Sequence, residues 1–274
     1  MKVWLSLFAS AFLLAAACGD DNDGGAAADA SVVDADTTPD AGIDPNSLRL
    51  TGLWSDFGAE TLADGVMPYE PQFELWTDGA LKRRWVYLPT GTTIDTSDPD
   101  QWVLPVGAKL WKEFVRDGKK VETRLIEKTG VSDWNLATYA WNDEGTDALR
   151  VEGFQGIRDV LGTGHDIPGP DDCLQCHERM PQVVLGFSAI QLDHEAADTA
   201  NVSIDDLDAA GLLTDSPPGA SIPHYPLPGN KAVEADALGY GLAHGSPCHN
   251  STGVGPGVGT PGSGFNVSVG VNSG

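Results

Sequence analysis

The clearest structural pattern in this chain lies in residues 109–125, which read KLWKEFVRDGKKVETRL. Apolar and charged residues partly alternate in 109–116 and again in 121–125, as expected for strands with one buried face. Between these two segments, Asp117-Gly118 readily adopts the positive φ angles of a tight hairpin turn. The stretch therefore predicts an antiparallel β-hairpin.

Further strand candidates flank this hairpin and are separated by turn-rich stretches such as residues 97–100. They cover Leu81–Leu88, Trp102–Val106, Thr138–Trp141 and Ala148–Val151. Seven of the eight tryptophans lie between Trp54 and Trp141, which supplies enough large apolar surface for a sandwich-like core. We therefore predict an α+β protein that begins with an antiparallel β (sandwich-like) domain over residues 48–155.

The following segment, residues 156–250, predicts a small, mainly α-helical module. Ser203 is a suitable helix N-cap, acidic residues follow it in the first turn, and Gly211 ends the pattern. Residues 231–244 predict another helix, which two internal glycines weaken. The Gly-rich tail, residues 251–274, is expected to be disordered.

Within this module, Cys173-Leu174-Gln175-Cys176-His177 has the pattern of a covalent c-type haem attachment site. Two thiols one helical turn apart can each add to a vinyl group of one porphyrin, and the next histidine can then ligate the iron. We expect the motif to open a helix that Pro181 interrupts. The module would then be cytochrome-c-like, with one haem c as cofactor and electron transfer as its function.

Two other interpretations of the cysteines remain open. A CxxC pair also forms redox disulfides, or contributes to a zinc site, which here would recruit Cys248 and His249. The loop before the motif, residues 162–170, does not supply the βαβ context of a thioredoxin-like site. In this alternative the protein is a ligand-binding lipoprotein whose β domain carries the function.

The first residues predict export and a lipid anchor. Met1-Lys2 is followed by an apolar run, Val3–Ala17, that is too short for a stable membrane span, and then by Cys18. Leu14–Cys18 resembles a bacterial lipoprotein processing site, in which Cys18 becomes the lipidated N-terminus; a conventional signal peptide or an uncleaved anchor are the alternatives. With residues 1–17 as signal peptide, the protein is expected in the bacterial cell envelope, facing the periplasm or the cell surface.

Residues 18–47 predict an acidic, disordered tether. From Gly19 to Asn46 the chain has eight Asp and no Lys, Arg or Glu, together with many Ala and Gly. Such a segment buries too little apolar surface to offset its ordering entropy. It would hold the folded part away from the membrane.

The formal net charge of −24 is unevenly distributed along the chain. Ten of the sixteen basic residues lie between Lys82 and Lys128, whereas from Val160 onward there are only two basic residues against thirteen acids. An acidic haem-bearing half would repel the phosphates of nucleic acid. It suits a redox partner protein with a basic docking face.

Several segments resemble a poorly characterised group of bacterial envelope proteins, in which a β-rich half is followed by cytochrome-c-like CxxCH motifs. The resemblance rests on Pro71–Ala80 with Lys82–Arg84, on Trp102–Gly107, on Glu122–Leu125 and on Tyr139–Ala148. It covers roughly residues 48–250 and implies a c-type cytochrome lipoprotein, without a substrate. It also implies a second CxxCH near the C-terminus.

At that place the chain reads Gly245-Ser246-Pro247-Cys248-His249, with glycine where the first cysteine would stand. One interpretation is a single thioether through Cys248 with His249 as axial ligand; another is that His249 reaches the haem on Cys173 and Cys176. A third is a thiol at Cys248 without haem. Because standard maturation uses two thiols, we expect one haem rather than two.

The sixth iron ligand separates electron transfer from catalysis. Met180 lies one helical turn after His177 and should lie on the same side of the ring. Met1 leaves with the signal peptide, and Met67 belongs to the β half. The candidates for the opposite side of the ring are His194, His224, His244 and His249. A second histidine favours electron transfer, whereas an open iron favours a haem enzyme of the peroxidase type.

Aromatic and acidic residues also lie together in the β half. Aromatic faces stack on sugars and clustered carboxylates bind hard cations, so these residues are candidates for a binding site of the β domain. They are Trp76 with Asp78, and Trp141 with Asp143, Glu144 and Asp147. The competing interpretation places the tryptophans in the core and the acids in turns.

Overall fold

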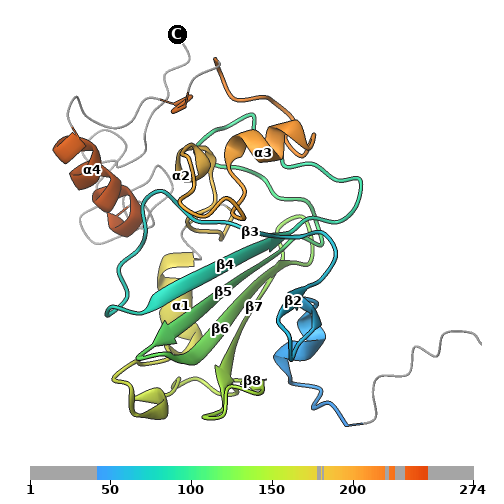
Figure 1. Ribbon diagram of the computed structural model, residues 1–274, viewed down its shortest axis with the longest axis vertical. Helices are drawn as coiled ribbons and strands as arrows, with labels where there is room; N and C mark the ends of the chain where they lie inside the picture. Colours follow the sequence, from blue (N-terminus) through green and yellow to red (C-terminus); the bar gives the residue numbers. More distant parts are fainter. Residues whose placement is uncertain (1–41, 178–179, 181, 220–221, 226–231, 246–274) are drawn as a thin grey trace, which may run out of the picture. The chain divides into compact units, whose positions relative to one another are not determined.

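The hairpin at residues 109–128 forms the middle of a six-stranded sheet in the computed structural model of the protein. The structure describes residues 42–177, 180, 182–219, 222–225 and 232–245. The strands of the sheet are β3 (Val66–Pro68), β4 (Leu81–Tyr87), β5 (Lys109–Arg116), β6 (Lys119–Lys128), β7 (Trp134–Trp141) and β8 (Ala148–Arg150). They lie side by side in sequence order, and each pair of neighbours is antiparallel (Figure 1).

Asp117 and Gly118 form the turn between β5 and β6, with φ angles of 51° and 77°. Positive φ at both positions is the requirement of the two-residue hairpin turn that Asp-Gly favours. Arg116 pairs with Lys119 across this turn, so the predicted hairpin is confirmed.

One face of the sheet is covered by the N-terminal segment. This segment contains the 3₁₀ helix η1 (Leu48–Thr51) and a two-stranded antiparallel sheet of β1 (Trp54–Asp56) and β2 (Thr61–Leu62). The buried residues of this layer include Leu48, Leu53, Trp54, Trp85, Trp111, Leu125, Tyr139 and Trp141. The second sheet of the predicted sandwich is therefore only two short strands.

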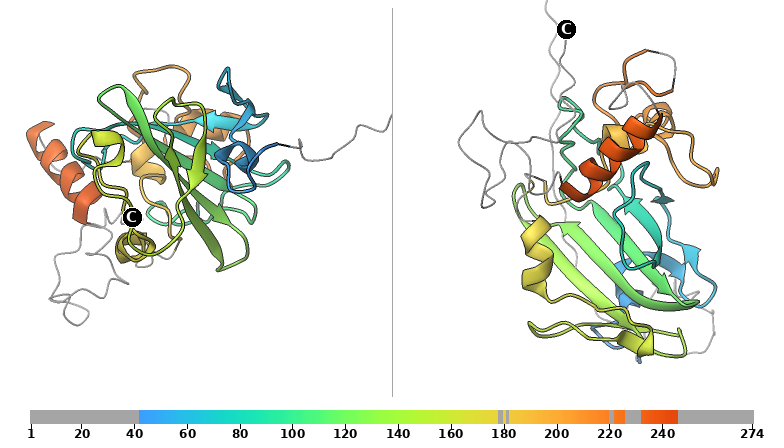
Figure 2. Two further views of the ribbon diagram at one scale, coloured as in Figure 1. Left: turned by 90° about the horizontal axis from the view of Figure 1, so that it is seen from below. Right: turned by 90° about the vertical axis from the view of Figure 1, so that its left-hand side faces the viewer.

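The opposite face of the sheet is covered by residues from the second half of the chain. They include the 3₁₀ helix η2 (Val160–Gly162) and the helices α1 (Pro170–His177), α2 (Ala189–Leu192) and α3 (Ile204–Ala209). The last helix, α4 (Ala232–Gly245), instead contacts the loop before β4, where the Trp76 N–H donates to His244. Figure 2 shows α1 alongside the strands of the sheet. Core residues from both halves pack together here, including Val86, Leu88, Leu110, Phe187, Leu192, Ile204 and Leu207. The predicted segments 48–155 and 156–250 therefore share a core rather than each enclosing its own.

The coarse prediction of an α+β protein with antiparallel β structure is confirmed. The predicted helix after Ser203 forms with a capping box, in which Ser203 and Asp206 each accept from the other's backbone N–H. The predicted helix at 231–244 is observed as α4.

Two finer predictions were wrong. Trp102–Val106 forms no strand; only Val103 makes an isolated bridge, to Asp95. The alternation there has another cause, since Trp102 and Leu104 bury their side chains from a loop. The cysteine motif ends a helix rather than opening one, because α1 already begins at Pro170.

Several predictions concern residues outside the described part. These are the signal peptide, Cys18, most of the acidic tether, Cys248 with His249, Pro181 and the C-terminal tail. The last residues assigned to the tether, 42–47, are described. Ser47 forms an isolated antiparallel bridge with Leu149 of β8. Among the described residues, no helix combines the length and the apolar character needed to cross a membrane.

Candidate haem attachment site

The start of α1 is fixed by a close approach of two loop segments. Ile157 and Ile167 form an antiparallel bridge, and η2 lies in the loop between them. A Cβ added to Gly156 would lie 2.1 Å from the Ile167 carbonyl oxygen, and one added to Gly169 would lie 2.2 Å from the Phe154 carbonyl oxygen. Only glycine allows the two backbones to lie this close, and Gly156 also has a φ of 64°.

The residues that follow favour a helix start at this point. Pro170 occupies the first helical position, where its fixed φ is suitable and its missing N–H costs nothing. Asp171 and Asp172 lie in the first turn, where carboxylates interact favourably with the helix dipole. The Gly169 N–H donates to Asp172 Oδ2 at 3.3 Å, and the Cys173 N–H donates to the Gly169 carbonyl at 3.2 Å.

Cys173 and Cys176 lie three residues apart on α1, so their side chains share one side of the helix. Cys173 is half-buried and Cys176 is exposed, and no residue of α1 is fully buried. Burial raises the pKa of the Cys173 thiol, which outweighs the opposing influence of Arg124. The cysteines are thus accessible for chemistry at the surface, with Cys173 in its thiol form at neutral pH.

His177, the last residue of α1, has a defined tautomer. Its Nδ1 lies 2.6 Å from the carbonyl oxygen of Val183, and because a carbonyl only accepts, Nδ1–H must donate. The other ring nitrogen, Nε2, then carries a lone pair, and it has no hydrogen-bond partner among the described residues. Burial lowers the pKa of His177, and Arg124 and Lys112 lower it further, so the imidazole is neutral at neutral pH.

The carbonyl that orients His177 comes from a strained residue. Val183 has a φ of 61°, a left-handed conformation that a β-branched residue rarely adopts. Beside it, Gln182 Oε1 accepts a hydrogen bond from Lys128 Nζ at 3.2 Å, which ties this segment to the end of β6. Such strain persists only where the surrounding structure imposes it, and it concentrates at functional sites.

These donors suit the group that the motif implies. A neutral histidine with Nδ1–H bound to a backbone carbonyl and a free Nε2 lone pair is the form that ligates a metal. Two thiols one turn apart precede it directly. The residues present therefore fit a covalently attached haem. Within the described residues, the motif included, no three His, Cys, Asp or Glu side chains are grouped closely enough to hold a metal ion by themselves.

A buried ion network lies on the face of the sheet toward α1. Glu122 is fully buried and accepts two hydrogen bonds from Arg124, at 2.7 and 2.9 Å. Its Oε1 also lies 2.8 Å from Nε2 of the buried His165. Burial alone would raise the pKa of Glu122, but Arg124 and His165 outweigh it and hold the pKa below its ordinary value.

The candidate distal ligand His224 is enclosed by carboxylates. Its side chain is 4% exposed, its Nδ1 lies 2.7 Å from Asp193 Oδ1, and its Nε2 lies 3.2 Å from Asp205 Oδ1. Asp193 also accepts from the backbone N–H groups of His224 and Tyr225. Both ring nitrogens of His224 are therefore engaged within the second half of the chain.

His194 and His244 are engaged in the same way. His194 lies between two backbone carbonyls, with Nε2 2.9 Å from the oxygen of Glu70. The Trp76 N–H donates to His244 Nε2 at 2.9 Å, and His244 Nδ1 lies 2.9 Å from a carbonyl of its own helix. His249 lies outside the described residues. The structure thus does not bring His194, His224 or His244 to the motif with an uncommitted ring nitrogen.

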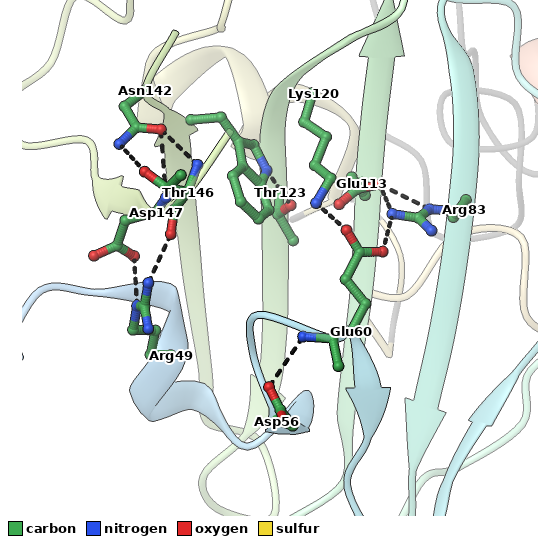
Figure 3. Close-up of polar contacts among 12 residues, drawn as sticks. Arg49, Asp56, Glu60, Arg83, Glu113, Lys120, Thr123, Asn142, Thr146 and Asp147 are labelled. Atoms are coloured by element: carbon green, nitrogen blue, oxygen red, sulfur yellow. Dashed lines mark hydrogen bonds and ion pairs between the residues drawn. The ribbon is translucent and has the colours of Figure 1, made fainter. Parts of the chain in front are cut away.

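The aromatic and acidic candidates of the β half do not form one open site. Trp141 is 3% exposed and donates from Nε1 to Thr123 Oγ1, so it belongs to the core. Asp147 lies 3.5 Å from Arg49 (Figure 3) and accepts from Ser47, whereas Asp143 pairs with Lys119. Of the other group, Trp76 is 65% exposed, and the Asp78 carbonyl accepts from Arg116. Glu144 is exposed.

A cleft of about 350 Å³ lies on the N-terminal side of the sheet. Its lining includes Trp54, Tyr69, Glu60, Arg83 and Asn201. Figure 3 shows that Arg83 bridges Glu60 and the fully buried Glu113, at 2.9 and 2.6 Å. Lys120 also pairs with Glu60, so Arg83 and Lys120 together balance Glu60 and Glu113. The other charged residues that line the cleft are Glu70, Lys82, Arg84 and Asp198.

The residues that the sequence did not single out are the charged ones on the face of β4–β6 toward α1. The alternation of these charged residues with apolar ones indicates that one face of the strands is polar. It does not indicate which segment of the chain covers that face. No protein-family model, no curated protein and no solved structure matches this chain. The site is therefore interpreted from its own geometry.

Proposed function

We propose that this protein is a c-type cytochrome that carries one haem c and transfers electrons in the bacterial cell envelope. Cys173 and Cys176 would hold the haem through thioethers, and His177 would ligate its iron. Cys18 carries the lipid that anchors the chain to the membrane. The segment after β8 corresponds to the cytochrome-c-like part of the envelope proteins that the sequence resembles. A haem bound at this motif would supply a one-electron couple.

The observation that carries this proposal is the state of His177. Its Nδ1–H donates to the Val183 carbonyl at 2.6 Å, which leaves the Nε2 lone pair available immediately after the second thiol. A ligating histidine commonly donates its other N–H to a carbonyl, which fixes the ring and raises its basicity as a ligand.

The cysteines support the proposal through their exposure. Thioether formation requires both sulfurs to reach the edge of one porphyrin, and the half-buried Cys173 and the exposed Cys176 share one side of α1. Neither thiol is needed in the hydrophobic core. Their spacing on a short surface helix suits attachment better than packing.

The charge around the motif supports electron exchange with a basic partner protein. Asp171 and Asp172 are both exposed on the helix that carries the thiols. Beyond Val160 the sequence has thirteen acids and two bases. Such a surface accelerates encounter with a basic docking face and slows encounter with acidic proteins or nucleic acid.

The purified protein is expected to be reduced and reoxidised reversibly, and its reduced form is expected not to bind carbon monoxide. The reason is that an electron carrier keeps both axial positions of its iron filled, whereas a peroxidase leaves one open. His249, the candidate outside the described residues, would be the histidine that fills the second position. Optical redox titration, followed by addition of carbon monoxide to the reduced protein, measures both properties. A carbon monoxide spectrum together with peroxide turnover would replace electron transfer by a peroxidase-type function.

A further inference from the structure

Three basic residues lie directly opposite one another on the central strands of the sheet. Arg84 of β4 pairs with Lys112 of β5, and Lys112 pairs with Arg124 of β6. We call Arg84, Lys112 and Arg124 the basic ladder. Like charges placed directly opposite in a sheet are destabilising, so three in a row require an explanation.

The side chains of the basic ladder are partly or almost fully buried. The side chain of Arg84 is 6% exposed and that of Arg124 is 25% exposed. Lys112 lies between them, partly buried, with Nζ 4.9 Å from the centre of the Phe114 ring. Solvent therefore screens the repulsion within the ladder only weakly.

Protein carboxylates neutralise only part of this charge. Arg84 and Lys82 share Glu74, at 2.7 and 3.6 Å, and Arg124 pairs with Glu122 at 2.7 Å. Lys112 makes no ion pair or hydrogen bond within the described part of the chain. Burial, together with the neighbouring Arg84 and Arg124, lowers the pKa of Lys112 well below its ordinary value, because it has no anion beside it. With Lys112 protonated and Lys82 included, four bases face two carboxylates, which leaves an excess of two positive charges.

The ladder faces the haem attachment motif. Arg124 pairs with Glu122, and Glu122 Oε1 lies 2.8 Å from Nε2 of His165, in the loop that leads directly into α1; Figure 2 shows α1 alongside the strands. The nearest end of the ladder thus lies by α1. From Arg124, two strand spacings of together about 9.5 Å lead to Arg84. The unpartnered Lys112 lies in the middle of this path.

We propose that the basic ladder is the subsite for the two propionate carboxylates of a haem attached at Cys173 and Cys176. This inference rests on the proposed function. Haem carries two propionates at the porphyrin edge away from the vinyl groups, and their two negative charges equal the excess of positive charge at the ladder. Lys112, which has no carboxylate of its own, is the residue that gains a partner.

The test compares the reduction potential of haem-loaded variants. Lys112→Met keeps the length of the side chain and removes its charge. A nearby cation destabilises the oxidised haem, which carries one more positive charge than the reduced haem. Removing the cation therefore stabilises the oxidised form and lowers the reduction potential. At a fixed potential the ratio of reduced to oxidised protein is expected to fall about tenfold, which is a shift of about 59 mV for a one-electron couple. Lys112→Arg should keep the potential of the wild type.

The matched control is Lys119→Met, which removes an exposed cation of β6 that pairs with Asp143. It should leave the potential unchanged. Arg84→Met is the second variant and should also lower the potential. The test therefore remains valid if Lys112→Met does not fold. If both ladder variants carry haem and match the Lys119→Met control, the propionate subsite is overturned while the proposed function stands. If the wild type carries no haem, the proposed function itself fails.

Discussion

Replacing Cys173 and Cys176 together by serine is expected to abolish covalent haem attachment and to leave the fold intact. The loss should be complete, because both thioethers require a cysteine sulfur. The fold should survive because no residue of α1 is fully buried and Cys176 is exposed. The exposed Cys176 should contribute about 0.5 kcal/mol or less to the change in the free energy of unfolding, and the half-buried Cys173 somewhat more. Intact mass and haem staining after denaturation measure attachment, and circular dichroism measures the fold.

Cys248→Ser is the matched control for this double variant. One haem on Cys173 and Cys176 predicts that Cys248→Ser keeps the full haem content of the wild type. Covalent haem that persists in the double serine variant would contradict the assignment of the site. Partial loss in Cys248→Ser would instead place haem at Gly245–His249.

Glu122→Gln is expected to lower the free energy of unfolding by about 3–5 kcal/mol, the usual cost of removing one partner of a buried ion pair. Glu122 is fully buried and is the shared partner of Arg124 and His165. Its neutral replacement leaves the Arg124 charge without a counterion. Chemical denaturation measures the change. Glu127→Gln, on the same strand but 28% exposed and 3.6 Å from Lys109, should change it by only about 0.5 kcal/mol.

The same residue predicts a sign for the pH dependence of stability. The folded pKa of Glu122 lies below its ordinary value of 4.5. Its contribution is therefore fully present above the pKa of the unfolded chain and is lost as the pH falls through the lower, folded pKa. Wild-type stability should fall below about pH 4.5 more steeply than that of Glu122→Gln. If the free energy of unfolding fell equally with pH in the two proteins, the ion pairs of Glu122 with Arg124 and His165 would not be the cause of the acid sensitivity.

Local signals predicted much of the fold. Asp117-Gly118 fixes the central hairpin by its backbone preferences, and Ser203 with Asp206 fixes the start of α3 by a capping box. Both depend on contacts within a few residues, which a sequence displays directly. The prediction for Trp102–Val106 was wrong because alternation reports burial, and a loop that buries Trp102 and Leu104 shows the same pattern.

Contacts between distant segments could not be predicted in the same way. The charged residues of β5 and β6 suggested a solvent-facing side, yet that side is covered by the second half of the chain, and Glu122 meets His165 there. The Cys173–His177 motif was evident from its spacing. The carbonyl of Val183 that orients His177 depends on a strained turn, which no residue in the sequence signals.

The most direct test of the account is a reduced pyridine haemochrome spectrum of the soluble protein, produced in a host with cytochrome c maturation, together with its intact mass. A c-type cytochrome with one haem is expected to show the α band of a c-type haem and the added mass of one haem. A protein without haem that instead binds zinc, or that forms a Cys173–Cys176 disulfide, would contradict it. Attention would then move to the cleft at Glu60 and Arg83 as the site of a binding function.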